Sequence, residues 1–257
     1  MLFSEKLNDF EKKHPCRSIT VDGARFRYVL SGEEHEKTLV LLNGGTNTLE
    51  MWLDYVDAFS EDYRVLLFDY PQELAANQAL VAGMHAFFEQ LGIKSPVFVG
   101  ASGGGMDENT LKSLKKQYRF APLMLAYMKR CNYEKLKPKL IKASMSHIRN
   151  ESAEEIAYAE DMFETIFKDY KREKDVHISG LLADLMNQTP VTAENFAELK
   201  GHILLILPDR DFFSEKMQAD LIALMHEPQI SYVSGGHLST VLKADDYIKV
   251  IRDFLGR

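Results

Sequence analysis

One serine in this chain lies where a serine could act as a nucleophile. Ser102 is in the run GASGGG (residues 100–105), directly after the apolar run Pro96–Gly100. A Gly-x-Ser-x-Gly sequence between a strand and a helix suits a sharp turn that lifts the hydroxyl clear of a sheet. Glycines are needed there because side chains would collide in so tight a turn. The pattern is common by chance, so a glycine-rich turn with an incidental serine is the alternative interpretation.

A histidine and an aspartate could supply the base and the acid that such a serine needs. A serine hydroxyl is a weak nucleophile near neutral pH, so it requires a base that a third group orients. His237 follows the apolar run Gln229–Val233, and Asp211 follows the run ILLIL at 203–207. Loops at these positions reach the carboxyl edge of a parallel sheet, where open α/β sheets place their sites. The chain order Ser, Asp, His therefore predicts a catalytic triad.

Other interpretations of these residues remain open. Asp209 competes with Asp211 for the role of the acid. Asp211 is preferred because it stands further from the end of the strand and just before the apolar pair at 212–213. Asp211 could instead be the N-cap of a helix, and His237, beside two glycines, could be an ordinary loop residue.

Two backbone N–H groups are predicted to bind the oxyanion of a tetrahedral intermediate. Such an intermediate carries charge that fixed donors must meet. Gly103, directly after the serine, is one predicted donor. Gly45, in the loop NGGT (residues 43–46) after the run TLVLL, is the other. A plain strand-ending turn is the alternative interpretation of that loop, since Asn-Gly is a common turn dipeptide.

Strands and helices must alternate to bring these residues together. Short apolar runs predict strands, and amphipathic runs predict helices. The runs Thr38–Leu42 and Pro96–Gly100 are expected to form buried strands. This alternation implies an α/β fold with a mostly parallel sheet and helices on both faces. The first two strands are expected to pair across Asp22-Gly23. The predicted strands are Arg17–Val21, Phe26–Leu30, Thr38–Leu42, Arg64–Asp69, Pro96–Gly100, Ile203–Leu207 and Gln229–Val233, and the helix-like runs are Met51–Phe59, Glu73–Leu91, Glu215–Met225 and Asp245–Leu255.

The middle of the chain has a different composition. From Asp107 to about Lys200 almost no strand-like run occurs, and Lys, Glu, Met, Leu and Tyr dominate. We expect residues 107–199 to form a helical cap inserted into a core made of residues 1–106 and 200–257. The basic run Lys112–Lys116 is expected to be a solvated helix face. Met124, Met128 and Met145 are expected to pack in the core, with the lining of an apolar pocket under the cap as the alternative.

The composition of the chain restricts the classes of partner that it could bind. The chain of 257 residues has a net charge of −7, whereas nucleic-acid-binding proteins usually concentrate Lys and Arg. It has two cysteines without metal-ligand spacing, and no histidines paired at such spacing. No apolar run approaches the roughly 20 residues of a membrane span, and the amino terminus is too charged for a signal peptide. We therefore expect a cytoplasmic location, no nucleic-acid or membrane partner and no metal. The oligomeric state, monomer or homodimer, is left open.

These motifs resemble those of the α/β-hydrolase superfamily, specifically its members with a helical cap. The matching runs are LLNGG, GASGGG, ILLILPDRD and SGGHLS, and they are spread over nearly the whole chain. The resemblance implies hydrolysis of an ester, amide, thioester or carbon–carbon bond through a serine acyl-enzyme, without a metal or organic cofactor. The simplest expectation is a carboxylesterase-like enzyme for a small, partly apolar substrate. A hydrolase-fold binding protein without catalysis, or a carbon–carbon hydrolase or perhydrolase-like activity, are the alternatives.

The chain departs from the family pattern in two places. Asn43 stands where the family usually has histidine, a tolerable change because the oxyanion donor is a backbone N–H. After Met106 the chain runs into the charged segment DENTLKSLKKQY, where the family has a buried helix and a central strand. We expect these elements, about 25 residues, to be absent. The alternative is a helix over Met106–Tyr118 and a strand over Phe120–Tyr127, against which Pro122 argues.

Overall fold

Short apolar runs form strands and the longer amphipathic runs form helices in the computed structural model, which describes residues 1–100, 107–148, 150–211 and 214–256. In chain order the elements are α1 (Phe3–Lys13), β1 (Arg17–Val21), β2 (Ala24–Ser31), β3 (Thr38–Leu42), η1 (Leu49–Trp52), α2 (Leu53–Phe59), β4 (Arg64–Phe68), α3 (Asn77–Gln90), β5 (Val97–Gly100), α4 (Glu108–Gln117), α5 (Ala121–Arg130), α6 (Tyr133–Met145), η2 (Ser146–Ile148), α7 (Ala153–Lys168), α8 (Arg172–Leu185), η3 (Ala193–Leu199), β6 (Leu204–Pro208), α9 (Glu215–Leu224), β7 (Gln229–Val233), α10 (Ser239–Leu242) and α11 (Ala244–Leu255). All seven predicted strands are present, with ends that shift by up to two residues.

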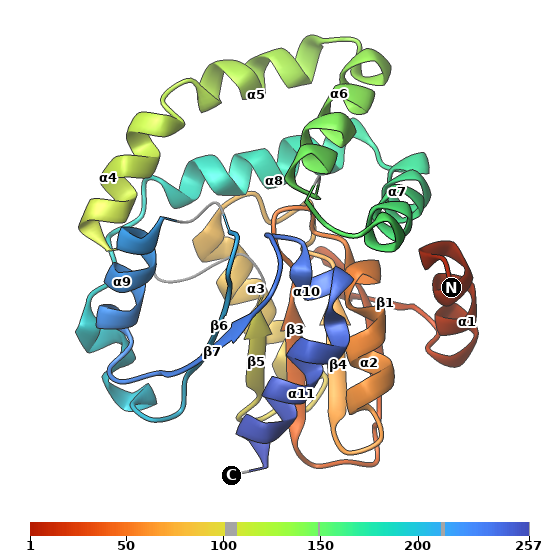
Figure 1. Ribbon diagram of the computed structural model, residues 1–257, viewed down its shortest axis with the longest axis vertical. Helices are drawn as coiled ribbons and strands as arrows, with labels where there is room; N and C mark the ends of the chain where they lie inside the picture. The colour runs from red at the N-terminus through yellow and green to blue at the C-terminus, as the bar shows by residue number, and fades with distance from the viewer. Residues whose placement is uncertain (101–106, 149, 212–213, 257) are drawn as a thin grey trace.

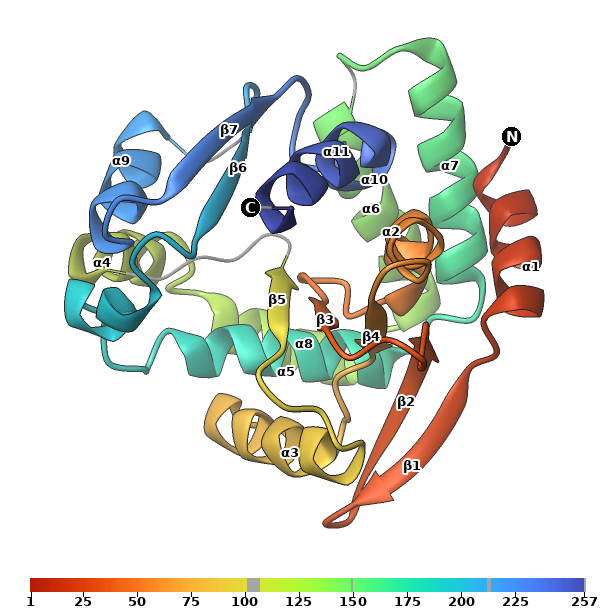
Figure 2. The same cartoon turned by 90° about the horizontal axis from the view of Figure 1, so that it is seen from below.

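The first sheet has five strands in the order β1-β2-β4-β3-β5 (Figure 2). β1 and β2 form the predicted hairpin, in which Asp22 and Gly23 both have positive φ, as a tight two-residue turn requires. β2 also pairs antiparallel with β4, while β3 pairs parallel with both β4 and β5. The carboxyl ends of β3 and β5 therefore lie at one edge of the sheet.

The last two strands form a sheet of their own. β6 and β7 pair in parallel from Leu204 opposite Gln229 to Pro208 opposite Val233. Within the described ranges between β5 and β6, every regular element is a helix, and neither β5 nor β6 has a second strand partner. Figure 2 shows β6 and β7 standing apart from β5. The sheet is therefore divided in two at the position where the sequence suggested that a strand is missing.

The alternative strand over Phe120–Tyr127 is wrong, because that run lies in helix α5. Pro122 occupies the first turn of α5, where a helix leaves N–H groups without partners and so tolerates proline. The preceding helix α4 begins after Asp107, whose side chain accepts a hydrogen bond from the N–H of Thr110 at 2.7 Å. The charged residues after Met106 thus include a helix start signal.

β5 was predicted to be a buried strand, and this prediction is wrong. Val97 and Phe98 are exposed, and Phe98 has 52% of its surface open to solvent. One ring contact, with Phe88 at 6.1 Å, is found for Phe98 in the described structure. The physical reason is the division of the sheet: a strand that pairs on one side only lacks the neighbour that would cover it.

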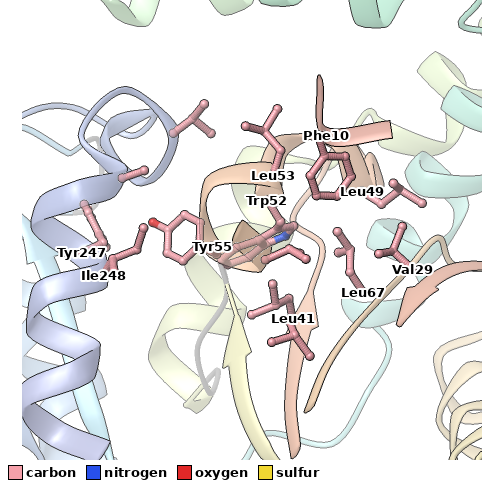
Figure 3. Packing of buried hydrophobic residues seen from close by; sticks show 14 of the residues in the cluster. Phe10, Val29, Leu41, Leu49, Trp52, Leu53, Tyr55, Leu67, Tyr247 and Ile248 are labelled. Carbon is pink, nitrogen blue, oxygen red and sulfur yellow. The ribbon is translucent and has the colours of Figure 1, made fainter. Parts of the chain in front are cut away.

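Two apolar clusters cover the two faces of the first sheet. Leu39 and Leu41 of β3 belong to one cluster and Val40 to the other, as the alternation of side chains along a strand requires. Figure 3 shows the first cluster, in which Tyr55 of α2 lies between the sheet and α11. The second cluster stacks Phe26 on Phe87 of α3 at 4.3 Å. The five-stranded sheet thus has an independent core on each face.

Helix α3 begins at Asn77, four residues later than predicted. The carboxylate of Asp184, at the end of α8, accepts hydrogen bonds from the backbone N–H and the side-chain amide of Asn77, at 2.8 and 2.9 Å. Asp184 thus binds a helix N-terminus from 107 residues further along the chain. Contacts over such a sequence distance are invisible to a local pattern.

Helices α5 to α8 lie over the edge of the first sheet at which β3 and β5 end (Figure 1), whereas η3 packs beside α9. We call the part between β5 and β6, Glu108–Leu199, the helical segment. Within the helical segment α5 packs on α8. Helix α7 of the segment packs on α1, which lies outside it. No described helix is long and apolar enough to span a membrane.

Candidate active site

The loops after β6 and β7 are joined by backbone hydrogen bonds. The N–H of Asp209 donates to Val233 O, and the N–H of Arg210 donates to Gly235 O, both at 3.0 Å. Gly235 has φ +133, and a Cβ there would lie 2.8 Å from the Cβ of Ser239. Glycine is therefore required at this position. Because both strands end at the same edge, these bonds bring the residues that follow each strand into contact.

Asp211 and His237 are the pair that this arrangement brings together. The Nδ1 of His237 lies 3.1 and 3.2 Å from the two carboxylate oxygens of Asp211. The carboxylate is almost fully buried, and the imidazole is about one quarter exposed. A carboxylate at Nδ1 holds the imidazole as the tautomer with its proton on Nδ1, so that Nε2 can accept a proton.

The carboxylate of Asp209 binds a backbone N–H group and not His237. Its Oδ1 accepts a hydrogen bond from the N–H of Gly235 at 2.8 Å, and its side chain is half exposed. This backbone hydrogen bond is the main reason why the pKa of Asp209 is held below its usual range. Of the two aspartates that compete for the role of acid, Asp211 is thus the one in contact with His237.

The loop after β3 is held by two tyrosines. Tyr70 donates its hydroxyl to Asn43 O at 2.7 Å, and Tyr170, between α7 and α8, donates to Thr46 O at 2.9 Å. Burial raises the pKa of both phenols, so both hydroxyls keep their protons and donate at neutral pH. Asn43, at the position where histidine was expected, donates its amide to Phe68 O at 2.7 Å. Its side chain therefore anchors the loop to β4.

A pocket of about 220 Å³ joins this loop to His237. Gly45 is exposed and lines the pocket, and a Cβ at Gly45 would meet no atom within 4 Å. The helical segment contributes Ser144 of α6 and Phe163 of α7. The other lining residues lie outside the helical segment and are mostly apolar or hydroxylic: Asn43, Gly44, Thr46, Thr48, Met51, Trp52, Leu238, Thr240 and Val241.

The predicted site residues fall into two groups. Asp211 and His237 are in contact, and Gly45 shares a pocket with His237. Ser102 and Gly103 lie outside the described residues. No group of three or more His, Cys, Asp and Glu side chains within the described ranges could hold a metal ion.

Glu151, two residues before α7, was not singled out in the sequence, although it contacts the loops after β6 and β7. Its carboxylate accepts a hydrogen bond from the N–H of Gly236 at 3.1 Å and pairs with the guanidinium of Arg210 at 3.0 Å. Only 5% of its side chain is exposed. Gly236 precedes His237 and Arg210 precedes Asp211, so Glu151 holds the residue before each member of the pair. No sequence signal could reveal this, because Glu151 and Gly236 are 85 residues apart.

Replacing Glu151 with Ala is expected to lower the free energy of unfolding by about 1–3 kcal/mol, because the N–H of Gly236 loses its acceptor in a buried place. Equilibrium unfolding in urea measures this change. Glu160→Ala, on the exposed face of α7, is the matched control and should change the free energy by less than about 0.5 kcal/mol. Equal effects of the two substitutions would contradict a role for Glu151 in holding the loops.

Comparison with protein-family models finds no match, and neither does comparison with curated proteins. Solved structures, in contrast, are similar over nearly the whole chain. An enol-lactonase from Burkholderia xenovorans is 16% identical with a TM-score of 0.71, covering 94% of this chain and 100% of its own. An epoxide hydrolase from Vigna radiata is 15% identical with a TM-score of 0.68, covering 95% and 99%. An esterase from Thermogutta terrifontis is 15% identical with a TM-score of 0.68, covering 93% and 97%.

TM-scores of 0.68–0.71 over nearly the whole chain show that the fold is similar, and identities of 15–16% carry information about the fold alone. The chain has the α/β-hydrolase fold.

Proposed function

We propose that this protein is a serine hydrolase, carboxylesterase-like, that acts on a small and partly apolar substrate. The observation that carries the proposal is the contact between His237 and Asp211, at 3.1 Å, beside the pocket that Gly45 lines. Two of the similar structures, an enol-lactonase and an esterase, are named for the cleavage of esters.

In the proposed reaction Ser102 attacks the carbonyl carbon of the ester while His237 takes the hydroxyl proton. Asp211 orients the imidazole and stabilises its charged form. The N–H groups of Gly45 and Gly103 bind the oxyanion of the tetrahedral intermediate. His237 then gives its proton to the leaving alcohol, and the acyl group remains on Ser102. Water, activated by His237, releases the acid and restores the serine.

We further propose that residues 107–199 cap a core made of residues 1–106 and 200–257. Ser144 and Phe163 of the helical segment line the same pocket as His237, which supports a role of this segment in substrate choice. Trp52, Met51 and Phe163 make much of the lining apolar. A pocket of about 220 Å³ suits a short acyl or alkyl group rather than a long chain.

A fluorophosphonate probe tests the proposal, because it forms a covalent bond with an activated serine hydroxyl. We expect the wild-type protein to be labelled and Ser102→Ala to remain unlabelled. Ser113→Ala, an exposed serine on α4, is the matched control and should be labelled like the wild type. Labelling that persists in Ser102→Ala would exclude Ser102 as the nucleophile.

A second candidate function is favoured by the division of the sheet after β5. The strained turn of a hydrolase nucleophile relies on the helix and strand that follow it. In the described part of the chain, β5 is instead followed by the charged helix α4 and has no further strand partner. The second candidate is therefore a hydrolase-fold protein that binds a small ligand in this pocket without turnover.

Turnover of p-nitrophenyl acetate distinguishes the two candidates. Hydrolysis that is abolished by His237→Ala supports the enzyme and excludes the binding protein. Trp52, the single tryptophan of the chain, lines the pocket, so its fluorescence reports ligand entry independently of catalysis. Ligand-dependent fluorescence without hydrolysis would favour the binding protein.

A further inference from the structure

Helix α5 buries one part of its apolar surface and exposes another. Its inner face, which includes Met128, packs on α8. Its outer face has no described element over it, and Figure 1 shows α5 as the outermost layer above α8. The outer residues, which we call the α5 patch, are Phe120, Leu123, Met124 and Tyr127, with 56%, 68%, 51% and 55% of their surfaces exposed.

These four residues belong to one surface. The spacing i, i+3, i+4 and i+7 places them along one stripe of a helix. The expectation that Met124 and Met128 both pack in the core is thus confirmed for Met128 and wrong for Met124. Contiguous exposed apolar patches on proteins mark sites of interaction with another surface.

The α5 patch lies in a basic part of the chain. Residues 108–145 contain ten Lys and Arg and only two Glu, although the whole chain has a net charge of −7. Arg119 and Arg130 stand at the two ends of the patch, and Lys115 and Lys116 precede it on α4. In the described ranges none of these four cations forms an ion pair. The guanidinium of Arg119 lies over the ring of Phe120, 4.7 Å from its centroid.

We propose that the α5 patch and its flanking cations dock this protein on an anionic lipid surface. Apolar side chains on one face of a helix bury in the boundary between head groups and acyl chains, while the flanking Lys and Arg meet lipid phosphates. The positive charge of residues 108–145 is opposite to that of such a surface and to the net charge of the rest of this chain. Docking would therefore also orient the molecule, with its acidic core away from the lipid.

Two other occupants fit less well. A nucleic acid would meet the cations but would leave four large apolar side chains without a partner. A second copy, packed by two-fold symmetry, would place the two basic segments against each other, and like charges repel. The proposed contact is peripheral, so it agrees with the finding that no described helix could span a membrane. It revises the expectation of no membrane partner, which rested on the lack of a spanning segment.

Flotation of the full chain with lipid vesicles tests the proposal. We expect binding to vesicles of phosphatidylcholine with phosphatidylglycerol, much weaker binding to phosphatidylcholine alone, and a loss of binding as salt is raised. Leu123→Ser combined with Met124→Ser, and Lys115→Glu combined with Lys116→Glu, should each lower vesicle partitioning by about tenfold or more.

Two matched controls separate docking from general changes in charge or apolarity. Val81→Ser removes a side chain that is 66% exposed on α3, and Lys94→Glu with Lys249→Glu reverses two exposed cations outside the helical segment. Both controls should bind like the wild type, and circular dichroism should show that all variants are folded. Equal binding by all variants, or no binding by the wild type, would overturn the proposal. So would a dimer that Leu123→Ser disrupts, or a preference for a DNA duplex over the vesicles.

Discussion

Replacing Asp211 with Asn is expected to lower kcat for a short p-nitrophenyl ester by about 10⁴-fold. Asp209→Asn, two residues away, should change kcat by less than about threefold. The contrast follows from the contacts of the two carboxylates. Asp211 contacts Nδ1 of His237, whereas Asp209 accepts a hydrogen bond from the N–H of Gly235.

The physical reason is the proton on the imidazole. An amide at position 211 can donate to Nδ1 and so favours the tautomer with its proton on Nε2, which cannot take the proton of the serine. It also removes the negative charge that stabilises the imidazolium formed during attack. An amide at position 209 keeps a carbonyl oxygen for the N–H of Gly235, so the loop should keep its conformation.

Steady-state kinetics of both variants, with thermal unfolding as a control for folding, measure the difference. If kcat stays unchanged and kcat/KM falls only because KM rises, the variant has a binding defect and not a catalytic one. Equal losses in the two variants, or full activity of Asp211→Asn, would contradict the assignment of Asp211 as the acid.

Replacing Phe68 with Ala is expected to lower the free energy of unfolding by about 3–5 kcal/mol, whereas Phe98→Ala should cost about 1 kcal/mol or less. Phe68, on β4, is fully buried and its ring contacts Phe26 and Phe87. Phe98, on β5, is half exposed with a single ring contact in the described structure. The same substitution thus compares a central strand with a strand whose far edge is open.

Equilibrium urea unfolding of the two variants, analysed with a common m-value, gives both costs. In an uninterrupted sheet β5 would be a central strand, and Phe98 would be buried as Phe68 is. A cost for Phe98→Ala close to that for Phe68→Ala would therefore mean that β5 is covered in solution, and would contradict the division of the sheet.

Much of the fold could be predicted from the sequence because its signals are local. Apolar runs bounded by turn residues identified the strands, and Asp22-Gly23 identified the hairpin. The position of Asp211 and His237 after parallel strands also follows from local order, since such strands end at one edge of a sheet. The presence of Pro122 correctly predicted that the run Phe120–Tyr127 is not a strand, because the missing N–H donor is a property of proline itself.

Other features were decided only by the tertiary structure. The exposure of β5 depends on which strands pair beside it, and the start of α3 depends on Asp184 from another helix. Glu151 and Tyr170 hold the candidate site from positions 85 and 124 residues away from their partners. The sequence by itself thus determined which elements form and which side chains stand at their ends. Only the folded chain decided which strand edges stay open and which distant groups hold the site, because these depend on contacts between residues far apart in the sequence.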